Sequence, residues 1–349
     1  MIAAFLFWGS STVEQVRLIY EQIEEAKRYL LGGSLLQLRL ALILLDNAAE
    51  LMMHRELRWN FASYDEFVPK WEPARTEWIR AGLGPKYTEE ERRDSEREFE
   101  PKMRILHLRL RQITEDDRRV LGVCHKLRCE AFHRGHIRAE ILEQVCKLLY
   151  LTVAGLTLKL PFKSYSIPGG DLDAENASFL ARFGFDSPYG LSTDKGRLQV
   201  RDKLVENIAF EATPFAETLS DDLLERLDRT VDGLAYVGES DDPSEIDYNL
   251  QHTQFWRELG AKMMKSGIRE PQLGEEFRVW RAAAKARFTL AKIKRRRRMA
   301  SAIRLCANPA AALDHYWAID RWFKPLEEDV AESVDRYDEE INMRIHHGR

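Results

Sequence analysis

The densest group of chemistry-bearing side chains lies between Cys124 and His136, where Arg128 is followed five residues later by His133. Cutting an RNA strand without a metal requires a group that moves a proton at the 2′-hydroxyl or the leaving oxygen near neutral pH, and histidine is suited to this. It also requires a fixed cation that holds the phosphate and offsets charge in the transition state, which arginine supplies through its planar guanidinium. The Arg-x4-His spacing therefore indicates a site for metal-independent RNA cleavage.

Helix geometry limits how these two side chains can meet. Five residues along an α-helix give a rise of about 7.5 Å and a rotation of about 140°, so the pair does not lie on one stripe. A common groove forms if His133 lies at a frayed helix end, which Gly135 favours, or if a second copy of the helix completes the site across a two-fold axis. The spacing alone is a weak pattern, because Arg118 and Arg119 also precede His125 at similar distances.

Other polar residues of this stretch have a functional and a structural interpretation. His125 shares a helix face with Arg128, and His136 follows the glycine directly, so each either touches substrate or serves as a hydrogen-bonded neighbour. Glu130 could take a polar role beside the arginine. A protonated histidine in the last turn of a helix also stabilises it by about 0.3–1 kcal/mol without any chemistry, which is the structural alternative for His133.

Two carboxylates on an earlier helix need partners. Asp46 and Glu50 lie one turn apart in the helix that is expected to be the most buried, where an unpaired carboxylate is costly. Pairing with Arg128 or Arg134 would orient the site. Pairing with Arg55 or another local base is the alternative, and the sequence does not decide between them.

These residues lie on helices, as judged by apolar period and capping. Helical spacing of apolar side chains predicts helices over residues 13–31, 35–58, 114–135 and 137–158. Thr114 begins a capping-box pattern followed by acidic residues, and Gly135 is expected to end that helix. Strand signals are nearly absent, so the predicted fold class is all-α.

The Arg-x4-His stretch, with its capped helix and the amphipathic helix after it, resembles the HEPN family of compact helical bundles. The run from Leu45 to Leu51 is similar to an early HEPN helix, and the resemblance covers about residues 11–158. It implies metal-independent endoribonuclease activity of toxin or antiphage-defence type, without a cofactor, at a site shared across a homodimer. Arg128 and His133 match the motif residues. Cys129 stands where many active members carry Asn, Asp or His, and some HEPN domains only bind nucleotides or act as scaffolds, so a non-catalytic binding or regulatory module is the alternative.

Composition predicts three regions. Residues 1–160 form the expected HEPN-like bundle, 161–197 a Pro- and Gly-rich loop or linker, and 198–349 a second helical region that binds RNA or regulates. The last helical stretch, about 310–344, is expected to be kinked or broken at Pro325.

The strongest charge run in the chain lies in the second helical region. Its basic residues fit binding to a phosphate backbone, and a solvated helix face is the other interpretation. The aromatic residues Tyr316, Trp317, Trp322 and Phe323 are expected in the core rather than as a base-stacking platform. The residues predicted to contact RNA are Arg134, Arg138, Lys294, Arg295, Arg296, Arg297 and Arg298.

Overall composition narrows the remaining classes. The formal net charge of the 349 residues is −4, so a nucleic-acid partner must be held by a local basic patch. The four cysteines form no CxxC pair, which predicts buried free thiols in a reducing compartment and no metal site. P-loop, GxGxxG, HExxH and GxSxG motifs are absent, and the apolar first eight residues are too short to span a membrane. We expect a cytoplasmic protein whose partners are RNA, a second copy of the chain and, as a further option, a neutralising or regulatory protein.

Overall fold

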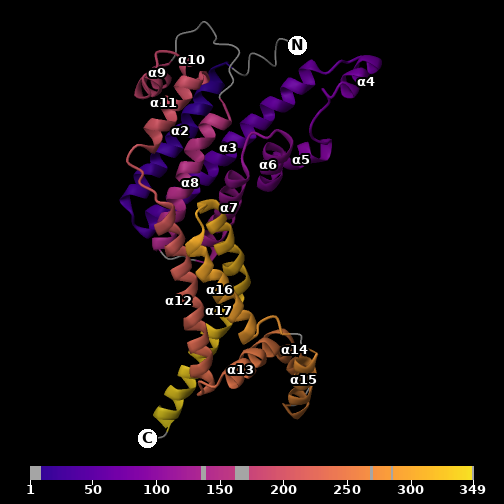
Figure 1. The fold of residues 1–349 in the computed structure, drawn as a ribbon, viewed down its shortest axis with the longest axis vertical. Coiled ribbons are helices and arrows are strands. Elements are labelled where there is room, and N and C mark those ends of the chain that lie inside the picture. The colour runs from indigo at the N-terminus through magenta and orange to yellow at the C-terminus, as the bar shows by residue number, and fades with distance from the viewer. Residues whose placement is uncertain (1–8, 135–138, 162–172, 268–269, 284–285, 348–349) are drawn as a thin grey trace. The chain divides into compact units, whose positions relative to one another are not determined.

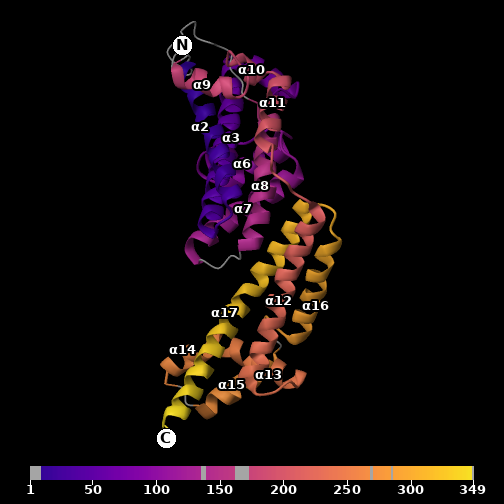
Figure 2. The same ribbon diagram turned by 90° about the vertical axis from the view of Figure 1, so that its left-hand side faces the viewer.

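The computed structural model describes residues 9–134, 139–161, 173–267, 270–283 and 286–347. Within these ranges the chain forms helices and no strand, which confirms the predicted all-α class. The chain divides into two compact units, unit 1 over Met1–Glu211 and unit 2 over Ala212–Arg349. Figures 1 and 2 show the helices of each unit from two directions.

Unit 1 is built around a long central helix. This helix, α3, begins after Ser34, whose hydroxyl accepts from the Gln37 N–H while the Gln37 side chain accepts from the Ser34 N–H. Such a reciprocal cap satisfies two backbone donors that would otherwise lack partners. One face of α3 is fully buried against its neighbours, including Leu38, Leu45 and Met53. The four bundle helices are α2 (Gly9–Gly32), α3 (Leu35–Phe67), α7 (Glu115–Arg134) and α8 (Ala139–Lys159).

Helix α8 is the most apolar element of unit 1. Among the described helices it is the one long and apolar enough to cross a membrane by length and composition, yet 61% of its apolar window is buried inside the protein. Val145, Leu149 and Val153 are all fully buried. These features are those of a core helix.

Short elements connect α3 to α7. Helix α4 buries none of its residues. Helix α5 begins with a second capping box, in which the side chains of Thr88 and Glu91 each accept a hydrogen bond from the backbone N–H of the other residue. Helix α6 packs on α3 and continues into one π-helical turn, η1. The bounds of these elements are α4 Glu72–Arg80, α5 Glu89–Arg97, α6 Phe99–Arg104 and η1 Ile105–Arg109.

The boundary between the units lies later than the sequence suggested. The predicted linker 161–197 instead contributes packed helices to unit 1, because Phe179 and Leu191 are buried in its core. Helix α11 packs along α8, and the buried Tyr150 hydroxyl donates to the Leu204 carbonyl at 2.9 Å. Residues 162–172 lie outside the described part. The helices are α9 (Ala174–Arg182), α10 (Tyr189–Ser192) and α11 (Asp194–Val205).

Unit 2 contains a long helical bundle and a smaller helical subdomain. Helix α17 packs against α12 and α16, and Asn308 caps it by accepting from the backbone N–H groups of Ala310 and Ala311. The predicted break at Pro325 is wrong, because α17 is one helix that continues through this residue. Phe323 and Leu326 beside the proline are fully buried, and this packing offsets the hydrogen bond that proline removes. The elements are α12 (Ala212–Gly238), α13 (Pro243–Phe255), η2 (Trp256–Gly260), α14 (Ala261–Lys265), α15 (Glu270–Ala282), α16 (Leu290–Ala302), η3 (Ile303–Leu305) and α17 (Pro309–His347).

A buried ionic network joins α12 to α17. The Arg226 guanidinium lies 2.7 Å from an Asp320 oxygen and 2.6 Å from a Glu327 oxygen, and the Tyr316 hydroxyl donates to Asp222 at 2.8 Å. Tyr316, Trp317 and Phe323 are buried, so the prediction that these aromatic residues are core is confirmed for them, whereas Trp322 is only half-buried.

Candidate functional site

A buried carboxylate links the central helix of unit 1 to the helix that carries the motif. Asp46 of α3 is 1% exposed, and its two oxygens lie 3.2 and 3.1 Å from Nδ1 of His125 on α7. One of the same oxygens lies 3.2 Å from Nε of Arg128, one helical turn further along α7. Because an ionised carboxylate only accepts, both contacts place donors of α7 on Asp46. Of the two alternatives for Asp46, the structure shows the one that orients Arg128.

The imidazole of His125 is also held from a third helix. The Phe99 ring of α6 stacks on it with the ring centroids 3.9 Å apart and the planes within 6° of parallel. The side chain of His125 is 25% exposed and that of Arg128 is 31% exposed, whereas Asp46 is buried beneath them. The arrangement presents an imidazole and a guanidinium at the surface, both held by one buried carboxylate.

Glu50, the second carboxylate of α3, has a partner that the sequence did not reveal. The Lys102 ammonium of α6 lies 3.0 Å from a Glu50 oxygen and donates to the Glu98 carbonyl at 3.2 Å. Lys102 is buried although it occurs in a strongly charged segment, so composition predicted a surface residue. One turn beyond Glu50, burial lowers the pKa of His54, and the charges of Lys102 and Arg58 lower it further.

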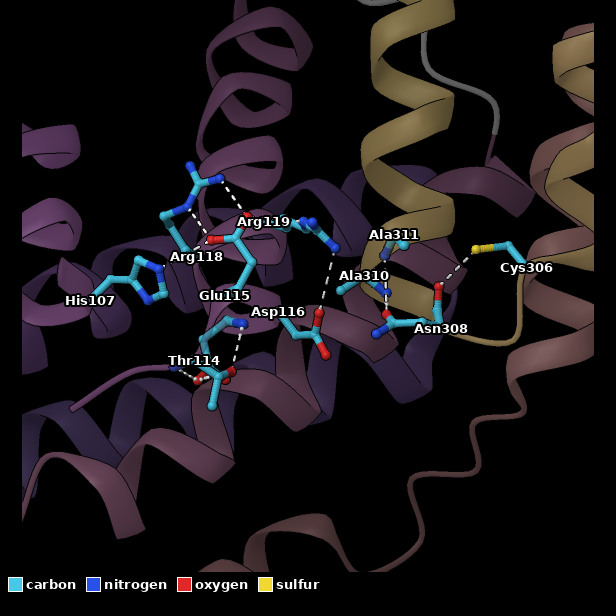
Figure 3. Close-up of polar contacts among 11 residues, drawn as sticks. His107, Thr114, Glu115, Asp116, Arg118, Arg119, Cys306, Asn308, Ala310 and Ala311 are labelled. Atoms are coloured by element: carbon cyan, nitrogen blue, oxygen red, sulfur yellow. Dashed lines mark hydrogen bonds and ion pairs between the residues drawn. The ribbon is translucent and has the colours of Figure 1, made fainter. Parts of the chain in front are cut away.

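The N-terminus of α7 is fixed by local bonds that the capping pattern predicted. The Thr114 backbone N–H donates to Asp117 at 2.7 Å, and the Asp117 N–H donates to the Thr114 hydroxyl at 3.2 Å. Asp117 also binds the Lys159 ammonium of α8 at 2.6 Å. Beside this cap, Figure 3 shows Glu115 between His107, Arg118 and Arg119. The hydrogen bond from Arg118, followed by its charge and that of Arg119, lowers the pKa of Glu115 to about 2.

The second half of the motif is described only by its backbone. Helix α7 extends to Arg134, so His133 lies in its last turn as predicted. The side chains of His133 and Arg134 lie outside the described residues, as do His136 and Arg138 entirely. The Arg128–His133 pairing therefore stays a prediction.

The residues directly after Arg128 differ in environment. Cys129 is exposed, with its sulfur 4.0 Å from Nη2 of Arg128, and Glu130 is half-buried. The expectation of a buried thiol is wrong for Cys129, because it lies on the outer face of α7. It is right for Cys124 and Cys146, where burial raises the pKa of both thiols. Within the described ranges, no group of three or more His, Cys, Asp or Glu side chains could hold a metal ion.

The basic run of α16 is divided between two surroundings. Arg297 forms an ion pair with Asp228 of α12, with Nε 2.8 Å from the carboxylate. Arg295 and Arg296 instead line a cavity of unit 2, while Lys294 and Arg298 are exposed. The basic residues that were predicted to form one RNA-binding surface therefore have different surroundings along the same helix.

Comparisons with protein-family models, with curated proteins and with solved structures give no match for this chain. The resemblance to HEPN proteins, drawn from the Arg-x4-His stretch and the run from Leu45 to Leu51, therefore stays a prediction.

Proposed function

We propose that unit 1 is a metal-independent endoribonuclease that works as a homodimer, with Arg128 holding the scissile phosphate and His133 acting as general acid or base. The observation that carries the proposal is the buried Asp46, which holds both Arg128 and His125 while leaving part of each exposed. A cation fixed in this way needs little reorganisation when a phosphate binds. A toxin-like or defence role in the cytoplasm belongs to the same proposal.

Arg128 keeps donors for a second anion. A guanidinium has five N–H donors in a planar fork, and Asp46 contacts the guanidinium through Nε. Among the described residues, the terminal nitrogens have one weak contact, from Nη2 to the Cys129 sulfur at 4.0 Å, and a phosphate that arginine binds through two parallel hydrogen bonds could replace it. Lysine could not replace it, because an ammonium lacks this fork.

Two histidines are candidates for proton transfer. His133 occupies the motif position at the end of α7. His125 binds Asp46 through Nδ1, which leaves Nε2 to exchange a proton, the arrangement in which a carboxylate orients a catalytic imidazole. The base removes the 2′-hydroxyl proton, the 2′-oxygen attacks phosphorus, and the 5′-oxygen leaves with a proton from the acid. The products of this reaction are a 2′,3′-cyclic phosphate and a 5′-hydroxyl.

The test is cleavage of end-labelled RNA by the full chain in the presence of a chelator. Arg128→Ala and His133→Ala are each expected to lower the rate by about 10²–10⁴-fold, the usual contribution of a proton-transfer group or a transition-state cation. Lys126→Ala is the matched control, because Lys126 is exposed on the same helix between the two histidines. Cleavage that requires a metal, or that survives both changes, contradicts the proposal. If His125→Ala abolishes cleavage and His133→Ala does not, His125 is the proton-transfer residue.

Mixing tests the shared site. If each site takes Arg128 from one subunit and His133 from the other, the two inactive variants regain part of the activity when they form mixed dimers. If the mixed dimers remain inactive, each site lies within one chain.

A second candidate function is a non-catalytic nucleic-acid- or nucleotide-binding module. The observation favouring it is that the Phe99 stack and the Asp46 contacts also serve packing between α3, α6 and α7. This function predicts salt-sensitive RNA binding without turnover and little effect of His133→Ala. Nucleotide that copurifies with the protein would favour a regulatory form of it.

A further inference from the structure

One face of α16 forms a basic pocket within unit 2. Lys292, Arg295 and Arg296 follow one another at helical spacing on the side of the helix away from Asp228. With the preceding loop and α17 they enclose a cavity of about 270 Å³, which we call the α16 pocket; it is lined by Arg287, Lys292, Arg295, Arg296, Met299 and Trp322.

Within the described part of the chain, no carboxylate pairs with the cations of the α16 pocket. Among the described contacts, Lys292 donates to the carbonyls of Ala286 and Arg287 at 3.0 and 3.1 Å, and Arg287 donates to the Trp322 carbonyl at 3.4 Å. No Asp or Glu of the described ranges forms an ion pair with these residues or with Arg295 and Arg296. Arg297 and Arg304 of the same segment, by contrast, pair with acidic residues of α12. Like charges gathered in a concave site raise the local potential and favour an anion there.

The same pocket has an aromatic plane. The Arg296 guanidinium lies 5.0 Å from the centroid of the half-buried Trp322 ring. The Phe288 ring packs edge-on against the Trp322 ring, with the two ring centroids 4.9 Å apart. Arginine and tryptophan planes are the surfaces on which unpaired bases stack. The cavity volume lies just below the range of about 300–1,000 Å³ for small-molecule sites, so it suits a single nucleotide unit.

We propose that the α16 pocket binds a nucleoside phosphate, with the base against the Arg296–Trp322 pair and the phosphate on Arg295, Lys292 or Arg287. The nucleoside phosphate is either free or part of a single strand. An acidic peptide would neutralise the cations but would leave the aromatic plane unused. The inference concerns binding only and does not depend on cleavage by unit 1.

The test uses the full chain and a labelled 2′-O-methyl oligoribonucleotide, which cannot be cleaved through its 2′-oxygen. Binding is measured by fluorescence anisotropy over a salt series, and stacking by quenching of tryptophan emission. Arg295→Ala and Arg296→Ala are each expected to weaken binding about tenfold. Arg295→Ala is also expected to reduce the slope of log affinity against log salt by about 0.7, because it removes one phosphate contact, whereas Arg296→Ala removes a stacking surface. Arg321→Ala is the matched control, because Arg321 is exposed on α17 beside Trp322 and lies outside the pocket lining.

Trp322 separates base stacking from charge. Trp322→Ala is expected to weaken binding about tenfold and to remove the quenching. Trp322→Phe keeps an aromatic ring against Phe288 and so controls for misfolding of Trp322→Ala. The affinity of Trp322→Phe is expected to lie within a few-fold of that of the original chain, without the quenching.

Competitors identify the source of the ligand. If adenosine monophosphate displaces the oligonucleotide at a concentration similar to that of the unlabelled oligonucleotide, the pocket is assigned to a free nucleotide. If much more adenosine monophosphate is needed, the pocket is assigned to a nucleotide within a strand. Either result supports the proposal. Equal weakening by Arg321→Ala overturns the proposal. Displacement by inorganic phosphate or by an acidic peptide that is as effective as displacement by the nucleotide also overturns it. Oligonucleotide binding that is unaffected by the Arg295 and Trp322 substitutions also overturns it.

Discussion

Replacing Asp46 with alanine is expected to destabilise unit 1 by about 2–3 kcal/mol. Breaking a buried ion pair by removing one partner costs about 3–5 kcal/mol, because the charge left behind is uncompensated. Here the remaining groups are His125 and Arg128, whose side chains are 25% and 31% exposed and can gain water. The expected cost therefore lies at or below the lower end of that range.

The coupling free energy between Asp46 and Arg128 is measured by a double-mutant cycle with Asp46→Ala, Arg128→Ala and both changes together. Two compact units make global unfolding a poor two-state process, so the local opening free energy of α3 and α7 is measured by hydrogen exchange. A coupling of about 1–2 kcal/mol is expected between these contacting residues. Lys126→Ala serves as the control and is expected to be additive with Asp46→Ala within about 0.5 kcal/mol.

The reasoning is refuted if Asp46→Ala and Arg128→Ala are also additive within that margin. Asp46 would then not fix the guanidinium, and the observation that carries the proposed function would lose its physical basis. Asp46→Asn refines the result, since it keeps the shape of the side chain and removes its charge. Stability retained with a loss of RNA cleavage would assign Asp46 to positioning rather than to folding.

Two further predictions concern other parts of the chain. The lowered pKa of Glu115 means that its stabilising contact with Arg118 is complete above pH 4.5 and is lost as pH falls toward about 2. Because this carboxylate is 40% exposed, screening limits the effect: Glu115→Gln is expected to cost about 1 kcal/mol at pH 7 and less than half of that at pH 3. The local opening free energy of α7, measured by hydrogen exchange, reports the penalty, and a penalty that does not change with pH would contradict the prediction. The second prediction concerns Gln254, whose buried side-chain amide accepts from the Phe288 N–H at 2.7 Å and donates to the Phe288 carbonyl at 2.9 Å. Gln254→Ala is expected to lower the free energy of unfolding by about 2–4 kcal/mol and to remove the protection of the Phe288 amide from hydrogen exchange. The control is Gln251→Ala, which removes a side-chain hydrogen bond to Asp247 one turn away on the same helix. If Gln251→Ala removes the protection of the Phe288 amide to the same extent, the role of Gln254 is refuted.

The sequence predicted what depends on local chemistry. The cap at Thr114 forms the expected bonds, because a capping box involves residues only three apart. The limits of unit 1 were not predicted. Proline and glycine after residue 160 mark turns, but whether Phe179 or Leu191 docks on the bundle depends on its shape, which local patterns do not contain.

The candidate site was predicted only in part for the same reason. The need of Asp46 for a partner follows from its place in an apolar helix, yet the choice of Arg128 over Arg55 is made by the packing of α7 on α3. The Glu50–Lys102 pair joins residues 52 apart in the sequence, and nothing near Lys102 distinguishes it from a surface lysine.

Each of two ion pairs has one buried member, Asp46 in the first and Lys102 in the second, and this accounts for the charge that α3 carries. Asp46 and Glu50 lie one turn apart, and each meets a cation from a different helix, Arg128 from α7 and Lys102 from α6. Apolar side chains alone tolerate sliding of one helix along another, whereas a displacement by one turn would leave a carboxylate unpaired in the interior. The pairs would thus specify the register of α6 and α7 on α3, and the register in turn fixes where Arg128 lies. If so, an apolar replacement of Asp46 together with Arg128 should restore stability but not RNA cleavage, because packing can take over the structural role of the pair and cannot bind phosphate.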